Sequence, residues 1–144
     1  MAIVYRPSVG DVLLCEFGPD PRDPATFPLN APPVSVVPEM HKRRHVVVLN
    51  SNAANDLVMV APFSTLPPSP VKAYHHFIPA GTYRFFGQDS WLKGDMMMAV
   101  SLTRLDRLTV NGWQTRTPLN AADRRACQAC ALNALGLGRL VAHL

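Results

Sequence analysis

Five basic or titratable side chains, His41 to His45, stand directly before an apolar run, Val46 to Leu49. The apolar run favours a buried strand, so arginine and histidine would lie at the mouth of a rigid element. Arginine offers a planar fork of donors that matches phosphate oxygens, and histidine carries protons near pH 7. Hydroxyls such as those of Ser64 and Thr65 can add hydrogen bonds as charge builds on a reacting group. These residue types suit chemistry at a phosphodiester.

An RNA phosphodiester can be cut without a metal ion. The 2′-hydroxyl attacks the adjacent phosphorus, while the protein positions the groups, stabilises the developing charge and manages two proton transfers. Other inventories are poorly represented, because the chain has no Gly-rich phosphate loop, no Gly-x-Ser-x-Gly elbow and only two glutamates. Three cysteines, Cys15, Cys127 and Cys130, favour buried apolar positions over a disulfide framework or a four-ligand zinc site. We therefore expect no cofactor and no metal.

Short runs with the composition of strands would position these residues. The first of them, "DVLLCEF", is apolar on both of its alternating faces, which predicts a central strand. Short strands separated by turn residues are typical of a small barrel or sandwich. The predicted strands are Asp11–Phe17, His45–Asn50, Leu57–Phe63, Ala73–Ile78, Ser90–Lys93 and Met96–Ser101.

A helix is predicted at residues 120–136, with Asn120 as its cap and Gly136 near its end. Its alanine-rich body carries a stripe at three- or four-residue spacing that we expect to face the core. That stripe consists of Ala122, Ala126, Ala129, Leu132 and Leu135. Many of the fourteen prolines fall in a long loop at residues 18–43. The predicted fold is mainly β with a C-terminal helix, in one domain over residues 1–144.

Charge and hydropathy narrow the functional classes. The net charge of +4 permits binding to nucleic acid or to an acidic partner. No apolar run approaches the roughly 18 residues that span a bilayer, and the N-terminus lacks the features of a secretory signal. We expect a cytoplasmic protein without membrane contact.

Four ordered blocks carry a resemblance to a known family. They are "GDVLLCEFGPD" (10–20), "RHVVVLN" (44–50), "VAPFST" (60–65) and "GDMMMAVSLTRLDRL" (94–108). Together they resemble the signature segments of MazF/PemK/Kid-type toxins, and most of all the YifN-like branch of the PemK superfamily. The resemblance covers roughly residues 8 to 108. No block is specific alone, so their order and spacing carry the identification.

The resemblance implies an SH3-like small β-barrel that works as a homodimer. It also implies a metal-independent endoribonuclease toxin of a type II toxin–antitoxin system, with RNA as target and an antitoxin protein that blocks the RNA groove. In such toxins the arginine that opens the "R-x-x-V-V-L" strand is catalytic, which falls on Arg44. A hydroxyl after the "P-x-T/S" turn assists it, which falls on Ser64, with Thr65 beside it.

Further candidates come from position in the chain. His41, Lys42 and Arg43 would supply a positive field for an incoming phosphate backbone, so we assign them to RNA binding. Adjacent residues of a strand point to opposite faces. One histidine of the pair His75 and His76 should therefore point in and the other out. Either could carry a proton, and we assign His76 to catalysis and His75 to RNA binding.

Two departures from the family pattern keep an alternative open. His45 stands where the family usually has proline, and Met96 to Ala99 replace polar residues expected to contact RNA. The methionines would pack in the core or at a dimer interface. The alternative is a non-catalytic RNA- or antitoxin-binding relative with the same fold. A gyrase poison resembling CcdB ranks lower, because such proteins depend on a C-terminal Trp-Gly-Ile, which is absent from Ala142 to Leu144.

Overall fold

The structure is a computed structural model that describes residues 2–19, 22–23, 38, 40–51 and 55–144 of the 144-residue chain. One α-helix, α1, runs over Ala121–Ala134, and three 3-10 helices are η2 (Gly94–Met96), η3 (Leu102–Arg104) and η4 (Gly138–His143). The strands are β1 (Val12–Glu16), β2 (Arg43–Asn50), β3 (Leu57–Ser64), β4 (His75–Ile78), β5 (Ser90–Lys93), β6 (Met98–Ser101), β7 (Leu105–Asp106), β8 (Thr109–Val110) and β9 (Trp113–Gln114).

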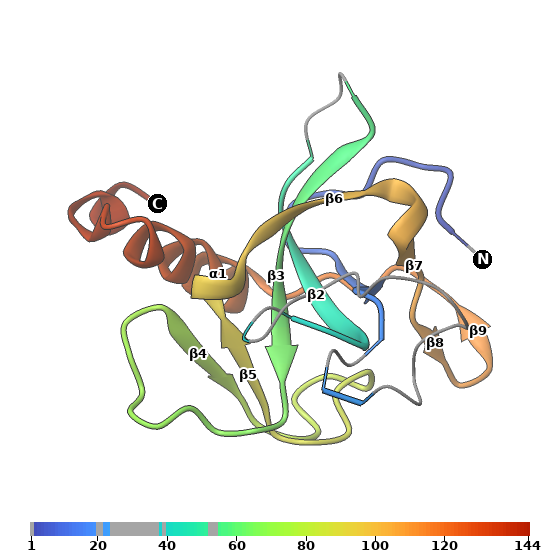
Figure 1. Cartoon of the computed structure of the whole chain (residues 1–144), viewed down its shortest axis with the longest axis horizontal. Helices are drawn as coiled ribbons and strands as arrows, with labels where there is room; N and C mark the ends of the chain where they lie inside the picture. The colour runs from blue at the N-terminus through green and yellow to red at the C-terminus, as the bar shows by residue number, and fades with distance from the viewer. Residues whose placement is uncertain (1, 20–21, 24–37, 39, 52–54) are drawn as a thin grey trace.

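The first seven strands form one antiparallel sheet in the order β4-β5-β3-β2-β1-β7, with β6 also paired to β3. The N-terminal half of β3 pairs with β6 and its C-terminal end pairs with β5, so the sheet curls around this strand. In Figure 1, α1 lies at one side of the curled sheet and the separate β8–β9 hairpin at the other. The prediction of a mainly β fold of the small-barrel type with a C-terminal helix is confirmed, and the curled sheet forms a half-barrel.

Alternation along the strands divides the buried residues into two clusters. Val12 and Val47 are direct partners and belong to the first cluster, while Leu13 and Val46 are partners in the second. Strand β1 is paired along both edges, with β2 and β7, and each of its faces contributes side chains to one of the two clusters, as the sequence predicts for a central strand. We call the side of the sheet that carries Val46 the second-cluster face.

Helix α1 begins at the predicted cap. The Asn120 side chain accepts a hydrogen bond of 2.8 Å from the Asp123 N–H, and Gly136 follows the last turn with φ +75°. The predicted core-facing stripe is wrong, because Ala122 is exposed and Leu135 is 60% exposed. Residues Cys127 and Cys130 are the buried ones. Alanine buries little area on any side, so the docked side is set by the cysteines and the polar contacts of Asp123.

The observed bounds of two strands near the candidate site residues differ from the predicted bounds. Strand β2 begins at Arg43, two residues earlier than predicted, so Arg44 lies inside the strand. Strand β6 begins at Met98, because η2 precedes it. Most of the predicted loop at 18–43 lies outside the described residues. Within the described ranges, no helix has the length and apolar character needed to cross a bilayer.

Candidate active site

Arg44 is held at the open end of β2. It pairs with Cys15 of β1, and it shares the second-cluster face with Val46 two residues away. The half-buried Arg44 side chain donates from Nε to the carbonyl oxygen of His41 at 3.2 Å. This bond fixes the guanidinium and leaves its two terminal nitrogens without a hydrogen bond to any other described residue. Those nitrogens form the fork that matches two oxygens of a phosphate.

Ser64 ends β3 on the same face as Arg44. Val46 of β2 is the direct partner of Pro62 of β3, and two further steps of this register place Arg44 opposite Ser64. The Ser64 Oγ accepts a hydrogen bond of 3.2 Å from the Leu66 N–H, which stabilises the turn after β3. The hydroxyl hydrogen stays available for donation. Thr65, the next residue, is exposed in the turn.

The two basic residues directly before Arg44 differ in their backbone and side-chain contacts. Lys42 has φ +66°, and it continues the β1–β2 pairing through its N–H to Gly18 and its carbonyl to Phe17. Arg43 points to the face opposite Arg44, where it forms a 3.0 Å ion pair with Asp106. The structure therefore separates Arg43 from the Arg44 side of the sheet.

His41 lies beside the start of β2. Its Nε2 is 3.3 Å from Nη2 of Arg22, and its backbone carbonyl holds Arg44. The structure thus brings His41 together with the candidate catalytic arginine.

The two adjacent histidines on β4 point to opposite faces of the sheet, as predicted. The predicted division into an inward and an outward ring is wrong, because the side chains of His75 and His76 are only 7% and 25% exposed. His75 accepts a 2.9 Å hydrogen bond at Nδ1 from the Lys72 N–H, and its Nε2 lies 3.9 Å from the Asp95 carboxylate. Burial and the nearby Lys93 lower the pKa of His75, so the ring is held neutral with Nδ1 as the acceptor. His75 shares a face with Lys93, its direct partner on β5.

His76 faces the first cluster and the helix. Its partner on β5 is Leu92, which in turn pairs with Phe63 of β3, and both of these side chains are buried in the first cluster. The Nε2 of His76 is 2.9 Å from Oδ1 of Asp123 at the start of α1. The structure thus does not bring His76 together with Arg44 and Ser64, and its catalytic role stays a prediction.

Asp123 links the helix to the sheet, a role that the sequence pattern did not indicate. Its Oδ2 accepts a 2.5 Å hydrogen bond from the Tyr83 hydroxyl, which itself accepts from the Asn120 N–H at 3.0 Å. Burial opposes the charge on Asp123, but hydrogen bonds from Tyr83 and His76 outweigh it, and its pKa lies below the ordinary value. Burial and this bond raise the pKa of Tyr83 to about 12.

His45, which replaces the family's usual proline, is part of the core side. Its ring centroid lies 5.3 Å from that of Phe86, on the face opposite Arg44. Burial lowers the pKa of His45, which favours the neutral imidazole. This position therefore acts in packing.

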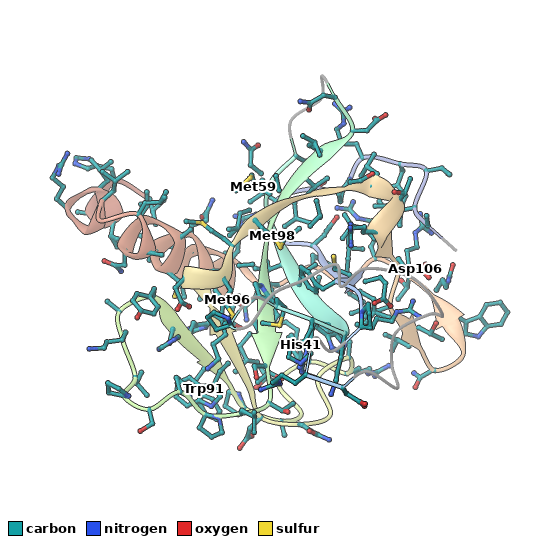
Figure 2. The ribbon with its side chains drawn as sticks, in the orientation of Figure 1. His41, Met59, Trp91, Met96, Met98 and Asp106 are labelled. Atoms are coloured by element: carbon teal, nitrogen blue, oxygen red, sulfur yellow. The ribbon has the colours of Figure 1, made fainter. Side chains whose placement is uncertain are left out.

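A pocket of about 580 Å³ opens along η2 and β6 and reaches Met40, the residue before His41. The methionine run forms one wall of this pocket. Met97 packs against the first cluster, whereas Met98 is 42% exposed and lies outside the core, so for Met98 the predicted dimer interface stays a prediction. Figure 2 shows Met96 and Met98 on the β6 side and His41 towards β2, with Trp91 farther along β5. The lining side chains are Phe17, Met40, Met96, Met97, Met98 and Arg104, among others. Three or more metal-ligating side chains do not gather anywhere in the described ranges.

Comparisons with known proteins bear on the family and the fold of the chain. Residues 8–129 match the family model described as "PemK-like, MazF-like toxin of type II toxin-antitoxin system". The chain is 35% identical over 114 residues to the putative uncharacterized protein YifN of Escherichia coli K12, covering 74% of this chain and 76% of that protein. It is 33% identical over 107 residues to an uncharacterized protein of Haemophilus influenzae, covering 70% of each.

Among solved structures, the Mycobacterium tuberculosis toxin MazF-mt6 superposes with a TM-score of 0.51 at 21% identity. The superposition covers 69% of this chain and 92% of that one, which supports a shared fold. The matched region of the family model includes Arg44, Ser64 and most of α1. The chain therefore belongs to the family of PemK-like, MazF-like toxins of type II toxin–antitoxin systems.

Proposed function

We propose that the protein is a metal-independent endoribonuclease that cleaves single-stranded RNA in the cytoplasm. The observation that carries the proposal is the Arg44 guanidinium, which is fixed at Nε by the His41 carbonyl and whose terminal nitrogens bond to none of the residues that the structure describes. Membership of the toxin family supports the same reading. The neighbouring Ser64 hydroxyl supplies a second donor on the same face.

In the proposed reaction, the 2′-oxygen of one nucleotide attacks the adjacent phosphorus and the bond from phosphorus to the 5′-oxygen breaks. The 2′-hydroxyl loses its proton, and the departing 5′-oxygen gains one. Arg44 stabilises the negative charge that develops on the non-bridging oxygens, and Ser64 donates a hydrogen bond to one of them. The products are a 2′,3′-cyclic phosphate and a 5′-hydroxyl end, and no metal ion takes part.

The proton carriers and the remaining RNA contacts stay predictions. The His75 side chain is 7% exposed on the face of β4 that carries Phe77, His76 lies against α1, and Thr65 is exposed beside Ser64. Lys42 is exposed next to Arg44, where its ammonium attracts the phosphate backbone.

The proposed partners follow from the family. An antitoxin protein would bind over the RNA site, and two copies of the chain would form a homodimer. The methionine-lined pocket supports an antitoxin partner, because an apolar cavity accepts side chains of a bound peptide. The same pocket supports the second candidate function, a non-catalytic relative that binds RNA or antitoxin without cutting.

The endoribonuclease and the non-catalytic relative are distinguished by whether RNA fragments with new ends form. Purified protein free of antitoxin is incubated with a diverse pool of single-stranded RNA in the presence of EDTA, and the ends of all fragments are determined. The proposal expects new 2′,3′-cyclic phosphate and 5′-hydroxyl ends. An RNA pool that is bound but stays intact would favour the non-catalytic relative, and an RNA pool neither bound nor cut would contradict both.

A further inference from the structure

The outer face of the β4–β5 hairpin carries a pair of aromatic rings. Phe77 of β4 and Trp91 of β5 are direct partners, with ring centroids 4.8 Å apart and ring planes inclined by 34°. Phe77 is 39% exposed and Trp91 is half-buried. This pair therefore presents aromatic surface outside both hydrophobic clusters.

Register places this aromatic pair in one row with the candidate active site. Ser64 of β3 is the direct partner of Trp91, which pairs in turn with Phe77. The neighbouring row on the same strands runs through buried first-cluster side chains, so the row of Ser64 points to the opposite side of the sheet. With a strand spacing of about 4.8 Å, the aromatic pair begins one strand away from Ser64.

We propose that Phe77 and Trp91 form a stacking surface for an unpaired base of single-stranded RNA, next to the phosphate held by Arg44. This inference rests on the proposed function and specifies where the substrate runs beyond the cleaved bond. Every base has a π-face, so a site of this kind accepts RNA with little sequence preference. Any preference for a particular RNA sequence would then come from residues outside the row of Ser64, Trp91 and Phe77.

Charge around the pair fits a nucleic acid. Lys93 lies two residues after Trp91 on the same face, and Arg44 lies on that face at the other side of Ser64. Two acidic groups flank the pair: Asp95 lies 3.9 Å from His75, and Asp89 accepts a 2.8 Å hydrogen bond from the Ala80 N–H at the other end of the hairpin. A partly exposed aromatic pair between two cations is the combination that single-stranded nucleic-acid sites use.

The chain offers a direct probe, because it has two tryptophans, Trp91 and Trp113. Trp113 is 78% exposed on the β8–β9 hairpin, outside the proposed site. In a Trp113→Phe variant, the fluorescence reports Trp91 alone, and in a Trp91→Phe variant it reports Trp113 alone. The probe is a short 2′-O-methyl RNA of mixed sequence, which lacks the attacking hydroxyl, and fluorescence anisotropy of labelled RNA follows binding independently.

The expected result is quenching of Trp91 in parallel with the anisotropy change, and no response of Trp113. Trp91→Leu should weaken binding by roughly 5- to 150-fold, as for loss of one stacked base, whereas Trp91→Phe should retain most of the affinity. Trp113→Leu is the matched control, with unchanged affinity. Circular dichroism and thermal melting confirm that each variant folds.

Three other outcomes would overturn the inference in distinguishable ways. RNA that binds while Trp91 emission stays constant would place the strand elsewhere and leave the proposed nuclease intact. Trp91 emission that changes with protein concentration alone, together with a dimer mass, would assign the aromatic pair to a contact between copies. Failure of the unmodified RNA pool to bind or be cut would remove the proposed function and this inference with it.

Discussion

Arg44 on β2 and Ser64 on β3 each lie two residues beyond the paired Val46 and Pro62, so strand alternation puts both on the same face of the sheet. The valines that follow Arg44 are buried on both faces, so the strand that carries the guanidinium is rigid. Hydrogen-bond donors held in place before the reaction stabilise developing charge without reorganisation. Pairing of β2 with β3 is therefore the structural basis of the proposed chemistry.

Ser64→Ala should reduce the rate of RNA cleavage by roughly 10- to 150-fold, the cost of one hydrogen bond to a charged group. The variant also loses the turn bond to the Leu66 N–H, so its melting temperature is measured in parallel. Thr109→Ala is the control, since Thr109 is exposed on the β8–β9 hairpin away from the site, and its rate should stay near that of the natural protein. Equal rates for all three proteins would show that the Ser64 hydroxyl takes no part.

Asp123→Asn should lower the free energy of unfolding by about 1.5 to 3 kcal/mol, because the carboxylate accepts hydrogen bonds from Tyr83 and His76. Chemical denaturation measures this loss. Asp56→Asn is the matched control, because Asp56 is exposed and its φ of 54° suits asparagine as well. A change no larger than that of the control would mean that these bonds do not anchor α1.

The same pair of proteins tests the lowered pKa of Asp123. A carboxylate with a folded-state pKa below its unfolded value of about 3.9 contributes its full stability above that pH. That contribution disappears as the pH falls through the lower folded value. The stability difference between the natural protein and Asp123→Asn should be constant from pH 7 to 5 and shrink below about pH 4. A constant difference down to pH 2 would contradict the assignment.

His45→Phe should flatten the dependence of stability on pH. Burial lowers the pKa of His45, so the unfolded chain binds a proton before the folded chain does as the pH falls below about 6.5. The natural protein should therefore lose stability between pH 7 and 5, and the variant, which keeps a ring against Phe86, should lose less. Denaturation curves at several pH values check this, with exposed His143→Phe as control. The same slope for His45→Phe and the natural protein would contradict a buried neutral imidazole.

Gly94→Ala should destabilise the fold by about 1 to 3 kcal/mol. A Cβ at this position would lie 2.7 Å from the Tyr74 carbonyl oxygen and 3.0 Å from that of Cys130, both of them backbone atoms. The strain would fall where α1 packs against η2. Gly87→Ala is the matched control, because nothing lies within 4 Å of its added carbon. Equal melting temperatures for the two variants would show that α1 has room to shift.

Local sequence patterns predicted most of the strands and the helix, because these elements are specified by residues that lie close together in the sequence. Three consecutive valines and alternating apolar residues specify strands, and Asn120 with Gly136 specifies a helix that begins and ends close to its observed bounds. The docked side of α1 was wrong because the deciding contacts join Asp123 to His76 and Tyr83, 47 and 40 residues away. Periodicity within the helix contains no information on such partners.

In the candidate site, too, local sequence predicted single residues, whereas their spatial arrangement depends on long-range pairing. Arg44 followed from its place before a buried strand and from the family resemblance. Its alignment with Ser64, and the row that continues to Trp91 and Phe77, depends on strand order and register, which alternation alone does not determine. The histidines were predicted to split between two faces, and they do. The sequence did not show which histidine contacts the helix, because that depends on where α1 packs against the sheet.

The most direct test of the central claim is RNA cleavage by Arg44→Ala in the presence of EDTA. The matched control is Arg125→Ala, which removes the same charge from an exposed position on α1. Initial rates on one single-stranded RNA pool, with folding verified by circular dichroism, are compared among the natural protein and both variants. We predict that Arg44→Ala loses roughly 100-fold or more of the rate while Arg125→Ala keeps it. Cleavage by Arg44→Ala at the natural rate would contradict the proposal that this guanidinium stabilises the transition state.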